Sequence, residues 1–78
     1  MKYIEVTKKE AQDIVRSGCL VNVGIYQGVN PKWIKDIQIN PDDYNILEYF
    51  TIEEFITKII SELDDNCHYT FKFFEVWE

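Results

Sequence analysis

The 78-residue sequence lacks the residue patterns on which several classes of protein depend. It has one histidine and two cysteines, Cys19 and Cys67, without C-x-x-C or H-x-x-x-H spacing, which excludes a structural zinc site. We expect both cysteines to be thiols in a reducing compartment. No run approaches the ~18 apolar residues of a membrane span, and the first residues form no signal-peptide core. The prediction is a cytoplasmic protein without cofactor, metal or membrane partner.

Signatures of catalysis are also missing. Cys67 and His68 are neighbours, but adjacent residues of a strand face opposite ways and cannot form a catalytic pair. Consecutive carboxylates do not supply two carboxyl groups that face one cleft with separated pKa values. The glycines are isolated and none begins a helix, so there is no phosphate-binding loop. We therefore predict that the chain is not an enzyme.

Basic residues are few beside acidic ones. The chain has eight basic and fourteen acidic residues, for a net charge of −6. Six of the basic residues lie in the first 35 positions, whereas eleven of the acidic ones lie in the remainder. A direct nucleic-acid binder should carry a basic surface. The charge instead favours a partner with a basic surface.

Residues 50–66 are predicted to form the main helix. Thr51 and Glu54 have the spacing of a capping box, and Phe50 and Phe55 have that of a hydrophobic staple. Apolar residues follow with a helical period. Asn66 is a suitable left-handed residue just after the helix.

The other elements follow from alternation, caps and turns. Thr7 and Glu10 repeat the capping-box spacing, and Gly18 is a suitable helix end, which predicts a helix between them. Within residues 33–39, strict alternation places Trp33 with Lys35 and Ile37, opposite Asp36. The predicted strands are residues 2–6, 19–27, 33–39, 44–50 and 69–77.

The last strand carries large apolar side chains on both faces. Phe71 and Phe73 alternate with Phe74 and Val76. Either a bulge near Phe73 switches the faces, or a second element or a partner covers the other face. If this strand lies at a sheet edge, a homodimer formed through it would cover that edge.

Together these elements predict one α+β domain over residues 1–78. Two helices would pack on one face of a mostly antiparallel sheet of four or five strands. The order β-α-β-β-(β)-α-β indicates a ferredoxin-like layout or a close variant. An antiparallel meander flanked by the same helices is the alternative.

Exposed carboxylates and tryptophans are the candidate binding residues. Asp64 and Asp65 are predicted in the last helical turn, where the helix dipole favours cations, so they could be retained for a cationic partner. Trp33 and Trp77 alternate with charged residues, as interface anchors do, although both could also lie at the rim of the core. The candidate partner-binding set is Asp42, Asp43, Glu53, Glu54, Asp64, Asp65, Trp77 and Trp33; solvated surface charge is the simpler interpretation of the carboxylates.

In its size, its MKYIEVTKKEAQDIV opening and its acidic second half, the chain resembles small phage or mobile-element proteins of low-GC bacteria, in the style of anti-CRISPR and other counter-defence inhibitors. The resemblance implies stoichiometric inhibition in the bacterial host cytosol, with the acidic protein occupying a basic nucleic-acid-binding surface of a host effector. The alternatives are a small-ligand, nucleotide-binding or sequestering domain that uses an open sheet face, and a dimeric adaptor.

Overall fold

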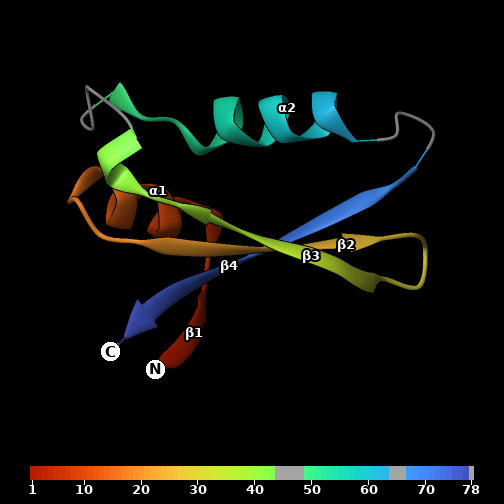
Figure 1. The fold of residues 1–78 in the computed structure, drawn as a ribbon, viewed down its shortest axis with the longest axis horizontal. Coiled ribbons are helices and arrows are strands. Elements are labelled where there is room, and N and C mark those ends of the chain that lie inside the picture. The colour runs from red at the N-terminus through yellow and green to blue at the C-terminus, as the bar shows by residue number, and fades with distance from the viewer. Residues whose placement is uncertain (44–48, 64–66, 78) are drawn as a thin grey trace.

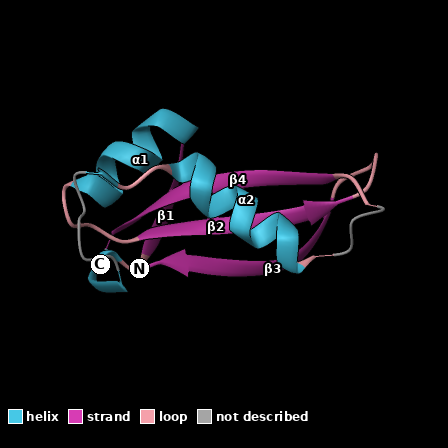
Figure 2. Cartoon of the chain, turned by 90° about the horizontal axis from the view of Figure 1, so that it is seen from above, coloured by secondary structure: helices cyan, strands magenta, loops and turns pink. Residues whose placement is uncertain are grey.

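Two helices pack against one face of a four-stranded antiparallel sheet in the computed structural model (Figures 1 and 2). The structure describes residues 1–43, 49–63 and 67–77. The predicted α+β class is confirmed. No helix in these ranges is long and apolar enough to cross a membrane. The elements are β1 (Lys2–Val6), α1 (Lys8–Arg16), β2 (Val21–Gln27), β3 (Lys32–Ile39), the short 3-10 helix η1 (Pro41–Asp43), α2 (Ile52–Glu62) and β4 (Tyr69–Trp77).

The strand order in the sheet is β1-β4-β2-β3, and every neighbouring pair is antiparallel. The connection through α1 therefore joins two strands that flank β4, and the connection through α2 joins two strands that flank β2. Both are split β-α-β units. Since β4 is a central strand, the condition for the predicted homodimer, an unpaired edge at this strand, is not met. The sheet edges are β1 and β3.

Local caps define where the helices begin. At α1 the capping box is complete: the Glu10 N–H donates to Thr7 Oγ1 at 3.1 Å, and the Thr7 N–H donates to Glu10 Oε1 at 3.0 Å. At α2 the Glu54 N–H donates to Thr51 Oγ1 at 3.4 Å, which is half of the predicted box. Gly18 takes a φ of +89° after α1, as a helix-ending glycine does.

The core lies between the sheet and the two helices. Val21, Val23 and Ile25 of β2 are fully buried, and both members of the predicted staple, Phe50 and Phe55, are buried. The α1 helix is tied to the start of α2 by two bonds: Arg16 Nε–H donates to the Phe50 carbonyl, and the Ile52 N–H donates to Gln12 Oε1. The other buried apolar residues are Ala11, Val15, Ile39, Ile52, Ile59 and Phe73.

Two predicted segments lie partly outside the described residues. In the strand predicted over residues 44–50, the first five residues are not described, and Tyr49 and Phe50 are not in a strand. The α2 helix ends at Glu62 with Leu63 as its cap, and Asp64, Asp65 and Asn66 lie outside the described residues.

The predicted alternation of β3 is wrong at one point. Ile25 pairs with Lys35, but the next residue of β2, Tyr26, pairs with Trp33, so Ile34 is an extra residue in β3. Such a bulge reverses the faces of the residues that precede it. Trp33 therefore shares a face with Asp36 rather than with Lys35. In β4, by contrast, pairing with β1 and β2 continues without a shift, so no bulge lies near Phe73.

Candidate binding site on the open sheet face

The sheet face opposite the helices is covered by none of the described elements (Figures 1 and 2). Cross-strand partners share a face, so the pairing register assigns residues to it. We call this surface the open face. Its members are Tyr3 and Glu5 of β1, Asn22, Gly24 and Tyr26 of β2, Trp33, Asp36 and Gln38 of β3, and Thr70, Lys72, Phe74 and Val76 of β4.

A cavity of about 290 Å³ lies on the open face, and we call it the open-face pocket. All four strands contribute to it, with aromatic rings prominent in the lining. This volume is close to the lower limit for pockets that bind small ligands, about 300 Å³. The lining residues are Tyr3, Asn22, Tyr26, Trp33, Asp36 and Phe74.

Gly24 provides the space in which these side chains converge. A Cβ at this position would lie 3.2 Å from Tyr26 Cε2, 3.4 Å from Asp36 Oδ1 and 3.6 Å from Phe74 Cε2. The first two distances are tighter than most real Cβ contacts. The positive-φ glycines of the described chain are Gly18 and Gly28, so Gly24 is needed for space rather than for an unusual backbone conformation.

Asn22 is the one buried polar residue in the described part of the chain, with 7% of its surface exposed. Its side-chain amide makes no hydrogen bond there. Yet no fully enclosed side-chain nitrogen or oxygen in the described ranges lacks a partner, so the amide atoms of Asn22 remain accessible from the pocket that they line. Water can therefore bond to this amide in the free protein, and a ligand in the pocket would replace that water with its own hydrogen bonds.

Trp33 and Asp36 form one wall of the pocket. The indole Nε1–H of Trp33 donates to Asp36 Oδ1 at 2.9 Å, which holds the ring beside the carboxylate although Trp33 is 58% exposed. The second carboxylate oxygen makes no hydrogen bond within the described ranges. On the other side of Gly24, the ammonium of Lys72 lies 5.0 Å from the centroid of the Tyr26 ring, a cation–π contact.

The four acidic candidates within the described residues lie away from this pocket, and Asp64 and Asp65 lie outside the described residues. Asp42 and Asp43 are exposed in η1, and Glu53 and Glu54 are exposed in the first turn of α2. Lys8 forms an ion pair with Glu53, so positive charge reaches this end of the helix layer. A shallow cavity here also contains Lys9 among its lining residues.

The two tryptophans lie on opposite faces of the sheet. Val76 pairs with Tyr3 on the open face, so the adjacent Trp77 points to the helix side, where it lines a separate cavity of about 440 Å³ with Met1, Lys2 and Ile4. Trp33 pairs with Tyr26 of β2, whereas Glu75, two residues before Trp77, pairs with Val21 of the same strand. Tyr26 and Val21 are five residues apart, which is about 17 Å along the strand. Among the members of the predicted set that the structure describes, Trp33 alone lines the open-face pocket.

The remaining polar candidates have simple structural roles. Cys67 Sγ accepts a hydrogen bond from Gln27 Nε2 at 2.8 Å, and the carbonyl of His68 accepts one from the Gly28 N–H. Cys19 is exposed. Among the described residues, no group of histidine, cysteine and carboxylate side chains could hold a metal ion.

Sequence reasoning did not identify the other pocket residues as a site. Strand alternation did place Asn22, Gly24 and Tyr26 on one face and Phe74 with Lys72 on another. A scan against family models and searches of curated proteins and solved structures found no match.

Proposed function

We propose that this chain is a stoichiometric, non-enzymatic binding protein whose open face contacts a positively charged surface of a protein partner. The observation that carries the proposal is the open-face pocket, which aromatic rings line together with the carboxylate of Asp36 on an uncovered sheet face. Tyrosine and tryptophan are enriched at protein interfaces and dominate their binding energy. Trp33, which is exposed but fixed by its bond to Asp36, has the properties of such an anchor.

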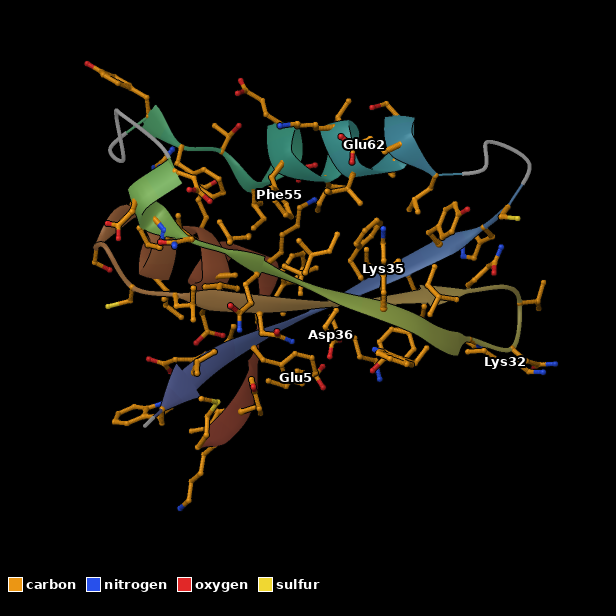
Figure 3. The ribbon with its side chains drawn as sticks, in the orientation of Figure 1. Glu5, Lys32, Lys35, Asp36, Phe55 and Glu62 are labelled. Atoms are coloured by element: carbon orange, nitrogen blue, oxygen red, sulfur yellow. The ribbon has the colours of Figure 1, made fainter. Side chains whose placement is uncertain are left out.

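Charge favours a basic partner. Of the acidic side chains in the described ranges, Glu53 alone is in an ion pair. On the open face, two carboxylates, Glu5 and Asp36, stand against one basic residue, Lys72. Figure 3 shows Glu5 and Asp36 on the side of the sheet away from α2, whereas Lys35 extends toward it. Together with the net charge of −6, these carboxylates would accelerate association with a basic surface.

The counter-defence inhibitors that the sequence resembles offer a biological setting for this activity. An acidic face with aromatic anchors would occupy a basic nucleic-acid-binding surface of a host effector, because a surface that holds phosphates also attracts carboxylates. In this proposal the contact is the open face rather than the start of α2, where Lys8 already pairs with Glu53.

Capture from a bacterial lysate with charge-matched variants tests the proposal. The wild type should capture proteins that are released at high salt. The double variant Glu5→Lys and Asp36→Lys should not capture these proteins. Asp13→Lys combined with Glu62→Lys changes the net charge equally on the exposed helix surface and should retain them. If the open-face variant captures the same proteins as the wild type, the proposed surface is wrong.

Nucleotide binding is the second candidate function. The unpartnered Asn22 amide favours it, because an asparagine amide can pair with the edge of a base while aromatic rings stack on it. A clear rise in Tm with a nucleotide, absent in Trp33→Ala, would favour this activity over protein binding.

A further inference from the structure

We propose that the open-face pocket receives an arginine side chain of the protein partner, an inference that rests on the proposed function and specifies its contact. The aromatic rings would stack on the guanidinium, while Asp36 and Asn22 would accept its hydrogen bonds.

The shape of the pocket suits a flat cation. A guanidinium is planar, weakly hydrated and stacks on aromatic faces, whereas an ammonium is a compact and strongly hydrated charge. The rings of Tyr26, Trp33 and Phe74 line the pocket, and the missing side chain of Gly24 lets the Tyr26 and Phe74 rings approach the strand closely. A cavity of about 290 Å³ is small for a drug-sized ligand but can admit one long side chain.

The polar groups of the pocket match the donors of arginine. A guanidinium has five N–H donors and no acceptor, so it requires several oxygen acceptors. Asp36 retains one oxygen without a hydrogen bond in the described chain. Asn22, whose side chain also makes no hydrogen bond there, lines the pocket and carries one carbonyl oxygen that can accept. The exposed indole of Trp33, already bonded to Asp36, would hold the carboxylate in place during binding.

Removal of the Lys72 charge distinguishes a cationic ligand from an anionic one. Its ammonium, 5.0 Å from the Tyr26 ring, shows that this wall attracts positive charge, but it would also repel an incoming guanidinium. Removal of its charge should therefore strengthen arginine binding. A nucleotide would respond in the opposite direction, because Lys72 is the one basic group on the open face that could meet its phosphate.

The charges around the pocket argue against a phosphate. Asp36 lines the pocket and Glu5 pairs with Phe74 at its border, so both carboxylates would repel an anion. The net charge of −6 acts in the same direction. An arginine would meet attraction from both carboxylates.

The test uses the full chain, labelled with ¹⁵N, and short glycine-flanked peptides that carry arginine, lysine or citrulline, with AMP as a fourth ligand. Citrulline preserves the shape of arginine without its charge. The arginine peptide should shift the Asn22 side-chain amide and the Trp33 indole N–H signals, and leave the Trp77 indole unchanged. We expect the lysine peptide to bind several-fold more weakly, and citrulline and AMP not to bind.

Variants at exposed positions complete the experiment. Asp36→Asn should weaken the arginine peptide about tenfold, equivalent to about 1.4 kcal/mol, and Lys72→Gln should strengthen it. Equal binding of arginine and lysine with the same signal shifts would overturn the arginine assignment but leave the proposed function intact. AMP binding that is lost in Lys72→Gln would overturn both. Peptide binding without shifts at Asn22 and Trp33, or no peptide binding, would overturn the pocket assignment.

Discussion

Gly24 lies in the middle of β2, where a glycine normally weakens a strand. Replacement by alanine would usually stabilise such a position by about 0.5–1 kcal/mol. In this chain, however, a Cβ would lie 3.2 Å from Tyr26 Cε2 and 3.4 Å from Asp36 Oδ1, so the Tyr26 ring or the carboxylate would have to move. Glycine at this position therefore lowers the stability of the strand but leaves room for the Tyr26 ring and the Asp36 carboxylate.

Gly24→Ala should separate binding from folding. We expect the variant to keep a Tm close to that of the wild type, because the gain from lower backbone freedom offsets the crowding. The displaced Tyr26 ring and Asp36 carboxylate should weaken the arginine peptide several-fold. Thermal unfolding and the NMR titration would measure the two effects. Unchanged affinity would contradict the role assigned to this glycine.

Individual pocket residues were only partly predictable. Alternation in β2 correctly placed Asn22, Gly24 and Tyr26 together, because strand side chains alternate wherever pairing is regular. Trp33 was assigned to the wrong face. Its position depends on the bulge at Ile34, which arises from pairing between β3 and β2, and the segment has no glycine or proline to mark it.

At the level of elements, local sequence determined the helix starts and most strand bounds. The capping-box spacing at Thr7 predicted α1, and β4 has the predicted bounds of Tyr69–Trp77. The central position of β4 was not predictable in this way, because strand order depends on which strands meet in three dimensions. That order pairs both edges of β4 and removes the argument for an exposed edge, while Phe74 and Val76 remain on the open face.

The capping box of α1 gives a pH-dependent contribution to stability. The Thr7 N–H, and secondarily the Thr7 hydroxyl, lower the pKa of Glu10. A carboxyl whose pKa is lower in the folded state stabilises the fold above its unfolded pKa, and this contribution disappears as pH falls through the folded pKa. The contribution of Glu10 should therefore be present at neutral pH and lost in acid.

Thr7→Ala should raise the pKa of Glu10 part of the way to its ordinary value, because the backbone N–H of residue 7 remains while the Thr7 hydroxyl, the second cause of the lowered pKa, is lost. Loss of the N-cap side chain should also destabilise the domain by about 1 kcal/mol. NMR titration of Glu10 and urea unfolding at neutral and acidic pH would measure both. Thr51→Ala, at the other helix, should leave the Glu10 titration unchanged. An unchanged pKa in Thr7→Ala would contradict the assigned cause.

For the whole molecule, small size makes stability sensitive to single core residues. A 78-residue domain has a free energy of unfolding of about 4–12 kcal/mol. Ile25 is fully buried at the centre of the sheet, and truncation of a buried isoleucine to alanine costs about 2–5 kcal/mol. One such change can remove a large part of the total.

Ile25→Ala should therefore lower the free energy of unfolding by about 2–5 kcal/mol, whereas Trp33→Ala should change it little because the indole is exposed. Urea unfolding monitored by circular dichroism would compare them. The same two variants distinguish a folding role from a binding role, because Trp33→Ala should lose peptide binding while it remains folded. A large loss of stability in Trp33→Ala would assign this tryptophan to the fold rather than to the interface.

The net charge of −6 should make salt act in opposite directions on folding and binding. A rise from about 0.01 to 0.15 M salt shortens the Debye length from about 30 to 8 Å, so repulsion among exposed carboxylates is screened. The Tm should rise by a few degrees, since self-repulsion destabilises the compact state. Over the same range, affinity for the arginine peptide should fall, because its attraction to Asp36 and Glu5 is also screened.

The charge-matched variant separates these effects. Asp13→Lys combined with Glu62→Lys brings the net charge closer to zero but leaves the open face unchanged. Its Tm should therefore depend less on salt than that of the wild type, while its peptide affinity should still fall as salt rises, since both open-face carboxylates remain. Scanning fluorimetry and peptide titration at the same salt concentrations would measure the two slopes. If the two slopes weakened equally in this variant, binding would depend on total charge, and the local role of the open-face carboxylates would be wrong.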